Sequence, residues 1–118
     1  MANKYFTSNN EALTQRQIDL KRSWAYRNKQ QDTPEWFCAG CGVRCQCNAH
    51  IIGQARCKQL RKVELIWHPD NFFPACYKCN AAIENPKGEA WKQLKNKDKC
   101  LSFIRQNDPE LYQKFICQ

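Results

Sequence analysis

The sequence predicts a small α+β domain in which two strands and a short helix form a core with helices on either side. The stretch from 36 to 91 contains two Cys-x-x-Cys pairs, Cys38 with Cys41 and Cys76 with Cys79. Runs of β-forming residues lie between the pairs, and segments with helical periodicity precede and follow them. Four thiolates are the ligand set of a closed tetrahedral zinc site, so we expect a structural zinc ion at these four cysteines.

Length and composition indicate one soluble domain. The chain has 118 residues, of which 42% are hydrophobic and 25% charged, and a chain this short gains from a metal that stabilises a modest core. No apolar run has membrane-spanning length and the first residues lack an apolar signal core, so we expect a cytoplasmic protein without a membrane partner. In that compartment the nine cysteines are expected as reduced thiols and metal ligands. A net charge of +8 favours a polyanionic partner such as nucleic acid, although a solvated basic surface would have the same charge.

Residues 1–34 are expected to form a helical extension. Ser8 and Glu11 have the spacing of a capping box, and no Gly or Pro follows before Thr33-Pro34, which predicts a helix from Ser8 to about Gln30. One side of this helix is expected to pack on the core, and it consists of Leu13, Leu20 and Trp24.

Residues 35–91 are expected to fold in the order strand, loop, strand, helix. The run 43–51 alternates as a strand does, 53–61 reads as a loop, and 63–67 is rich in β-forming residues. A short helix is expected over 80–84, and the Asn85-Pro86-Lys87-Gly88 sequence ends it. The aromatic residues expected in the core are Trp36, Trp67, Phe72, Phe73 and Trp91.

Residues 92–118 are expected to be helical. Apolar positions from Glu89 onward recur with helical spacing, and Asp108 before Pro109 predicts the N-cap and first residue of a final helix. The buried side of that final helix is expected to consist of Leu111, Phe115 and Ile116.

Several motifs follow one another in a recognisable order: Cys38-x2-Cys41, Ala49-His50-Ile51, Asn71 and Cys76-x2-Cys79-Asn80. This pattern resembles the zinc-bound HNH, or His-Me finger, endonucleases. The closest likeness is to the phage Rap/NinG recombination endonucleases, because Leu65-Ile66-Trp67 and the motif residues after it keep that family's spacing. The resemblance covers about the middle half of the chain.

The resemblance implies a ββα-metal core and a metal-dependent endonuclease that hydrolyses phosphodiester bonds of duplex or branched DNA, leaving 5′-phosphate and 3′-hydroxyl ends. It implies that His50 is the general base that deprotonates the attacking water. It further implies that Asn71 orients His50 and that Asn80 holds Mg²⁺ or another catalytic divalent cation. Many members have Asp directly before the motif His, and here that position is Ala49, so Asn48 or a water is expected to substitute.

The segment that follows His50 contains the basic residues expected to contact nucleic acid. They are Arg56, Lys58, Arg61 and Lys62. Two other interpretations stay open: a non-catalytic zinc module that binds nucleic acid, and a small interaction protein in which zinc is only a scaffold. The sequence also leaves open whether the protein is a monomer or a homodimer.

The remaining Cys and His residues have less specific patterns. His68 precedes Pro69 and is interpreted as a turn residue. A second zinc site could combine Cys45, Cys47 and Cys57 with His68 or Cys100, but buried free thiols are the commoner state of such cysteines.

Overall fold

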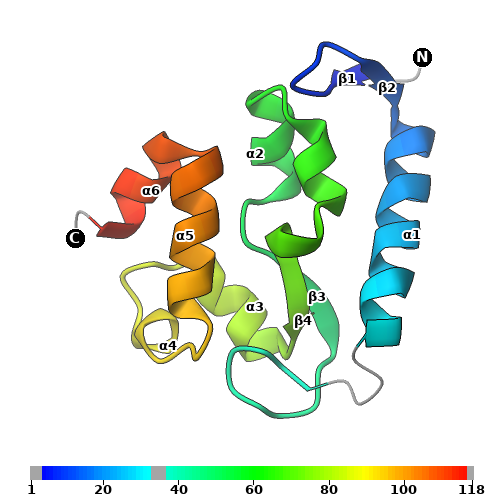
Figure 1. Ribbon diagram of the computed structural model, residues 1–118. Coiled ribbons are helices and arrows are strands. Elements are labelled where there is room, and N and C mark those ends of the chain that lie inside the picture. The colour runs from blue at the N-terminus through cyan, green and yellow to red at the C-terminus, as the bar shows by residue number, and fades with distance from the viewer. Residues whose placement is uncertain (1–3, 33–36, 117–118) are drawn as a thin grey trace.

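A pair of antiparallel strands lies at the centre of the computed structural model, which describes residues 4–32 and 37–116 (Figure 1). The helix α1 runs along one side of the molecule, and α5 with α6 lies on the other. The elements of the described part are β1 (Lys4–Phe6), β2 (Ala12–Thr14), α1 (Gln15–Asp32), β3 (Cys47–His50), α2 (Gln54–Gln59), the 3₁₀ helices η1 (Val63–Trp67) and η2 (Pro69–Asn71), β4 (Phe72–Ala75), α3 (Tyr77–Ile83), α4 (Glu89–Lys92), α5 (Lys97–Asn107) and α6 (Pro109–Ile116). The predicted mixture of helices and sheet is confirmed. The predicted helix end at Thr33-Pro34, the boundary between 34 and 35 and the predicted core residue Trp36 lie outside the described residues.

The strands β3 and β4 pair antiparallel, with Cys47 opposite Ala75 and His50 opposite Phe72. β4 leads directly into α3, whose N-cap is Cys76. Because α3 also packs against β3, the second Cys-x-x-Cys pair lies beside the strand that ends at His50. The predicted strand over 43–51 is thus confirmed only for its second half.

The prediction of a second strand over 63–67 is wrong, because Val63–Trp67 forms the 3₁₀ helix η1. Leu65 and Ile66 are both buried although they are adjacent, which a strand with one solvated face cannot achieve. The observed second strand is β4, which contains Pro74. Pro argues against a central strand, but in a sheet of two strands each strand is an edge, so the missing N–H is tolerated.

The predicted loop over 53–61 is also wrong, because its middle forms the helix α2. Cys57 is fully buried on the inner side of α2, which packs against η1. The chain then leaves the helix through Arg61, whose φ is +57°. Tertiary packing therefore outweighs the polar composition of this segment.

The capping box predicted at Ser8 is wrong, because β1 and β2 form a hairpin in which Tyr5 pairs with Leu13. The amide and hydroxyl of Ser8 instead donate hydrogen bonds to the Glu64 carboxylate. The capping box belongs to Thr14 and Gln17: the Gln17 amide donates to Thr14 Oγ1 at 3.3 Å and the Thr14 amide to Gln17 Oε1 at 2.9 Å. The helix therefore begins at Gln15.

The buried side of α1 differs from the predicted one. Ile18 and Ala25 are buried, whereas Leu20 and Trp24 are 61% and 62% exposed. The helix packs on η1, and at about 100° per residue the positions two and six after Ile18 point away from that contact. Leu13 is buried as predicted, but it belongs to β2.

The C-terminal part confirms its predicted start signal. Asp108 Oδ1 accepts a hydrogen bond from the Leu111 amide at 3.2 Å, and Pro109 is the first residue of α6. Phe115 is buried and Leu111 half-buried, whereas Ile116 is exposed. Phe72, Phe73 and Trp91 lie in the core as predicted. No helix in residues 4–32 and 37–116 combines the length and the apolar character needed to cross a bilayer.

Candidate metal centre and histidine site

The two Cys-x-x-Cys pairs come together into one cluster. The Sγ atoms of the four cysteines all lie within 4.8 Å of one another, and those of Cys41 and Cys76 are 3.6 Å apart. Tetrahedral zinc with Zn–S bonds of about 2.3 Å requires sulfur separations of about 3.8 Å. The four predicted cysteines therefore have the spacing that zinc needs, and three of them are buried while Cys41 is exposed.

Backbone amides turn toward the sulfurs in both pairs. The Gly40 amide donates to Cys38 Sγ at 3.3 Å, and the Cys79 amide donates to Cys76 Sγ at 3.5 Å. Gly40 itself is needed for close packing, because an added Cβ would lie 3.0 Å from Cys79 Sγ and 2.7 Å from Leu94 Cδ2. The sequence thus builds two tight turns that aim their thiols at one point.

The thiols also have the electrostatics of a cation site. Burial alone would raise the pKa of Cys38, but backbone hydrogen bonds at Cys76, Gly40 and Cys41 lower it to about 7. Burial and the neighbouring thiols raise the pKa of Cys79. The protein stabilises the first thiolate of the set and resists further negative charge, so a bound dication is the natural counter-charge for four thiolates. The cluster therefore could hold a metal such as zinc.

The other cysteines do not form a second cluster within the described part of the chain. Cys57 and Cys100 are fully buried, and burial raises the pKa of Cys57 to about 12 and that of Cys100 to about 11. His68 serves its predicted role in a turn, because its Nδ1 accepts a hydrogen bond from the Asp70 amide at 3.0 Å. Cys57 and Cys100 are thus buried thiols, and His68 is a turn residue.

His50 is the last residue of β3, and its ring lies between α1 and η1. Its Nε2 is 2.8 Å from the backbone oxygen of Ile66, and the hydroxyl of Tyr26 lies 3.2 Å from Nε2 and 3.4 Å from Nδ1. A carbonyl oxygen can only accept, so a neutral His50 ring presents its Nε2–H to Ile66 and keeps its lone pair on Nδ1. The ring is therefore held in one orientation and one tautomer.

The environment of His50 keeps the imidazole uncharged. Burial lowers its pKa below the usual value near 6.5, and the charge of Arg22 lowers it further, although the hydrogen bond to Ile66 acts in the opposite direction. Tyr26 stays protonated, since burial raises its pKa. The Nδ1 lone pair of the neutral imidazole faces the Tyr26 hydroxyl at 3.4 Å, and a neutral imidazole can accept a proton at physiological pH.

Asn71 is fully buried and uses its whole amide group. Its Oδ1 accepts from the Ile52 amide at 2.7 Å, and its Nδ2 donates to the carbonyl oxygens of Leu65 at 2.8 Å and Ile52 at 3.1 Å. These bonds tie the segment just after His50 to the 3₁₀ helix that presents the Ile66 carbonyl. Asn71 therefore braces the scaffold around His50 without contacting the ring itself.

Asn80 lies on α3 next to Cys79 and is half-buried. Its side chain has no hydrogen-bond partner in the described part of the chain, so its amide oxygen is available to a ligand. Ala49, the residue directly before His50, is fully buried, and its side chain offers no ligand atom. Asn48 is half-buried opposite Pro74.

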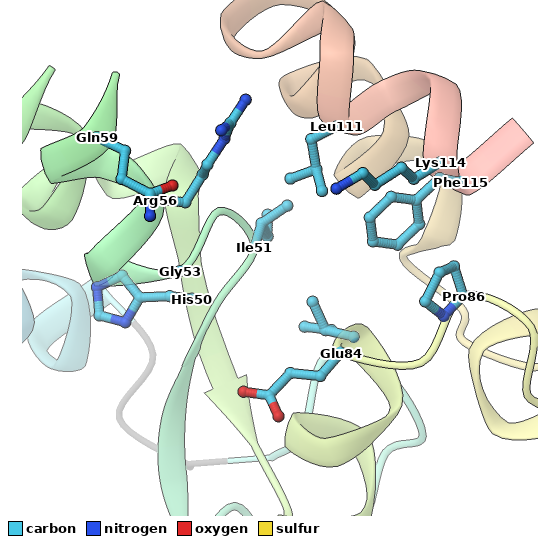
Figure 2. Close-up of a pocket in the computed structure, with 11 residues that line it drawn as sticks. His50, Ile51, Gly53, Arg56, Gln59, Glu84, Pro86, Leu111, Lys114 and Phe115 are labelled. Carbon is cyan, nitrogen blue, oxygen red and sulfur yellow. The ribbon is translucent and has the colours of Figure 1, made fainter. Parts of the chain in front are cut away.

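A cavity of about 350 Å³ adjoins His50 (Figure 2). It lies between the end of β3 with α2 on one side and α3 with α6 on the other. Figure 2 shows His50 at one edge, Glu84 below, and Lys114 and Phe115 across from them. Neither Asn71 nor Asn80 lines this cavity, although Asn80 is one helical turn before Glu84 on α3.

The four basic residues predicted to contact nucleic acid all have intramolecular contacts. Arg56 forms an ion pair with Asp108, with Nε 2.7 Å from Oδ2 and Nη2 3.0 Å from Oδ1. Lys58 Nζ lies 4.2 Å from the ring centre of Tyr5, and the guanidinium of Arg61 lies 4.3 Å from that of Phe6. Lys62 Nζ donates to the backbone oxygen of Asn107 at 3.0 Å. Arg56 is the most firmly held of the four, while Arg61 remains exposed.

Several groups around His50 were not anticipated from the sequence. Tyr26 belongs to the N-terminal helix and has no motif that marks it, and the Ile66 carbonyl is a backbone group. Glu84 had a readable signal, because it follows Asn80 by four residues in a predicted helix and such residues share one face. Comparison of the chain with protein-family models, with curated proteins and with solved structures found no match in any of the three.

Proposed function

We propose that the protein is a metal-dependent DNA endonuclease of the HNH, or His-Me finger, type. The observation that carries this proposal is His50, the last residue of β3: its imidazole is neutral, and its Nε2 lies 2.8 Å from the carbonyl oxygen of Ile66. Its position at the end of a strand whose partner leads into the cysteine-bearing helix matches the order of the motifs that suggested the family. The four-cysteine cluster supports a structural zinc ion in the same unit.

In the proposed reaction, His50 accepts a proton from a water molecule while the water oxygen attacks the phosphorus. The bond from phosphorus to the 3′ oxygen breaks, leaving a 5′-phosphate, and the 3′ oxygen takes up a proton to become a hydroxyl. His50 then returns its proton to solvent. The low pKa of His50 suits this cycle, because the base is regenerated readily near neutral pH.

Asn80 would hold the catalytic divalent cation through its amide oxygen, and Mg²⁺ suits such a hard oxygen ligand. When bound, such a cation stabilises negative charge on the phosphate and on the leaving oxygen. Asn71 acts as a positioning residue, since it fixes the segments on either side of His50. The net charge of +8 supports DNA as the substrate, and the phage recombination enzymes that the motifs resemble suggest duplex or branched DNA.

A second candidate is a zinc-containing module that binds nucleic acid without cutting it. Two observations favour it: Ala49 supplies no metal ligand, and the ring of His50 is partly covered by Tyr26. Both candidates bind DNA, so only cleavage separates them.

The test is a nuclease assay on plasmid, linear and branched DNA with Mg²⁺, Mn²⁺ or Ni²⁺. His50→Ala should lower cleavage by about two to four orders of magnitude while zinc content and DNA binding persist. His68→Ala is the matched control, because it changes the other histidine of the chain and should cut normally. DNA binding without cleavage of any substrate would favour the binding module, and full activity of His50→Ala would remove His50 as the base.

A further inference from the structure

The outer side of α1 exposes large apolar side chains to solvent. Leu20 and Trp24 lie one helical turn apart and are 61% and 62% exposed. Together with Lys21 and with Trp67 of η1 they line a shallow hollow of about 420 Å³. Figure 1 shows α1 along one flank of the molecule, so this side of the helix faces away from the rest of the fold. A contiguous apolar surface with a polar border is typical of a site for another molecule.

The border of the hollow is basic. Lys21 is exposed, and its Nζ lies 5.0 Å from the centre of the Trp67 ring, which places a positive charge at the hollow itself. Arg16 and Arg27 lie about one turn before and one turn after the apolar pair, so they share its side of the helix. Both are exposed and have no hydrogen-bond or ion-pair partner among the described residues. The carboxylate of this stretch, Asp19, is already paired with an arginine of the same helix at 3.3 Å. The apolar centre is therefore surrounded by positive charge.

These charges argue against a second copy of the chain as the occupant. A two-fold contact would place the same side of α1 against itself. Antiparallel helices that met at the apolar pair would bring Arg16 of one copy toward Arg27 of the other. Like charges that face each other without a carboxylate between them disfavour association. The surface is instead complementary to a partner with negative charge.

The apolar centre favours an acidic protein over nucleic acid. Duplex DNA presents mainly phosphate and sugar to a protein, which would leave Leu20 and Trp24 without apolar contacts. A stacked base needs an open aromatic face, but Lys21 lies over the ring of Trp67, and Leu20 has no aromatic face. An acidic protein segment supplies both carboxylates for the cations and apolar side chains for the hollow. Trp and Arg are also the residues that most often dominate the binding energy of protein interfaces.

From this arrangement we propose that the outer side of α1 binds an acidic segment of another protein, in which large apolar residues recur with helical spacing. The apolar residues enter the hollow, as an amphipathic helix does in a groove, and the acidic residues face Arg16, Lys21 and Arg27. Tyr26 is on the inner side of α1, where it contacts His50, so the partner leaves that site accessible. The proposal does not depend on the proposed nuclease activity, because it concerns a different surface.

The probes are three synthetic peptides of about 16 residues, a length at which a helix can form. All three have Leu at the same helically spaced positions, and their other positions are mainly Glu in the first, Gln in the second and Lys in the third. Binding of each labelled peptide to the whole protein is measured by fluorescence anisotropy. We expect a micromolar Kd for the Glu peptide, binding about tenfold weaker for the Gln peptide, and no measurable binding of the Lys peptide.

Two variants separate the apolar from the charged contribution. Trp24→Ala should weaken binding of the Glu peptide at least about tenfold, because it removes a large apolar group from the hollow. Tyr77→Ala is the matched control, since Tyr77 is 63% exposed, lies on α3 and does not line the hollow. Arg16→Gln should weaken the Glu peptide about threefold and leave the Gln peptide unchanged. All three residues are exposed, so the variants should keep the fold, which circular dichroism checks.

Loss of peptide binding in Trp24→Ala, with DNA affinity unchanged, would support the proposal. The proposal is overturned if the Glu peptide does not bind, if the Lys peptide binds equally well, or if Trp24→Ala binds like the wild type. A Trp24→Ala variant that loses affinity for DNA would assign the surface to nucleic acid instead. A wild-type dimer that Trp24→Ala converts to a monomer in sedimentation would assign it to a second copy of the chain.

Discussion

Nε2 of His50 lies 2.8 Å from the backbone carbonyl oxygen of Ile66, so the ring depends on the position of a 3₁₀ helix rather than on a side-chain partner. This geometry and the burial of the ring, which lowers the pKa of His50, predict a defined pH response. A group whose pKa is lowered on folding stabilises the folded protein at pH values above its pKa in the unfolded chain, which is near 6.5 for His. This stabilisation is lost as the pH falls through the pKa of the group in the folded protein.

Cleavage should follow the same direction, because only the neutral ring can accept a proton. We expect kcat/KM to stay constant from neutral pH down to the ordinary pKa of an imidazole and to fall only at lower pH. The measurement is a profile of kcat/KM between about pH 5 and 8. If kcat/KM instead fell with a midpoint above the ordinary imidazole pKa, the assignment of His50 would be contradicted, because the pKa of His50 is shifted downward.

Asn71→Ala should destabilise the protein strongly. The substitution leaves the Ile52 amide and the Leu65 carbonyl buried without the partner seen here, and each such group costs about 1–3 kcal/mol. We expect a loss of about 2–5 kcal/mol in the free energy of unfolding, measured by urea denaturation. Asn80→Ala is the matched control and should change stability by less than about 0.5 kcal/mol, because its amide has no partner in the described part of the chain. Equal losses in the two variants would refute the bracing role of Asn71.

The four-cysteine cluster predicts one tightly bound zinc ion per chain. Removal of the ion by a strong chelator should abolish cooperative folding, because four crowded thiols lose their counter-charge. Elemental analysis and thermal melting test this. Cys76→Ser should lose the zinc, whereas Cys45→Ser, outside the cluster, should retain it. A zinc-free chain that still melts cooperatively would contradict the prediction. Two zinc ions per chain would indicate a second site that includes Cys45, Cys47 and Cys57.

The four-cysteine cluster could be predicted from the sequence because its signal is local. Each Cys-x-x-Cys turn presents two thiols through its own backbone amides, so only the meeting of the two turns depends on the rest of the fold. The start of α6 was predictable for the same reason, since Asp108 caps a helix whose first residue is Pro109. Signals contained in a few adjacent residues do not depend on distant packing.

The remaining elements depended on contacts between distant segments. Val63–Trp67 has β-forming residues but packs as a 3₁₀ helix, because α1 and α2 bury it from two sides. Leu20 and Trp24 were expected inside because they were grouped with Leu13 on one side of the predicted helix, whereas Ile18 and Ala25 are the buried residues of α1. Around His50, the motif identifies the histidine, but Tyr26 comes from a distant part of the sequence and could not be assigned without the fold.

Binding to DNA should weaken steeply with salt, because each neutralised phosphate releases counterions. Arg61 is the most informative of the four predicted contacts to test, since it is exposed and, among the described residues, its guanidinium lies only against the Phe6 ring. Arg61→Glu should weaken binding to all sequences alike and reduce the slope of log affinity against log salt by about one. Lys99→Glu, which makes the same charge change at an exposed site on α5, is the control. Affinity that does not change with salt would exclude nucleic acid as the partner.

The ion pair between Arg56 and Asp108 predicts a structural role for a residue that the sequence assigned to DNA. Asp108 is 1% exposed and also caps α6, and its bonds to Arg56 join α2 to the C-terminal helices. Burial would raise the pKa of Asp108, but the Arg56 hydrogen bond and charge lower it overall. The stabilisation is therefore present at pH values above the ordinary pKa of Asp, about 3.9, and is lost as the pH falls below it.

Asp108→Ala should lower the free energy of unfolding at neutral pH by about 2–4 kcal/mol, since it removes a helix cap and leaves the Arg56 charge partly buried. Glu110→Ala is the control: its carboxylate lies 3.6 Å from Arg56, but the side chain is 78% exposed, so solvent screens the interaction. The difference between the two variants in the free energy of unfolding, measured by urea denaturation, should be smaller at about pH 3. In a double-mutant cycle, Arg56→Ala should couple to Asp108→Ala and not to Glu110→Ala. If Arg56→Ala instead leaves stability unchanged but weakens DNA binding in proportion to its charge, the guanidinium acts on the phosphate backbone and not in the fold.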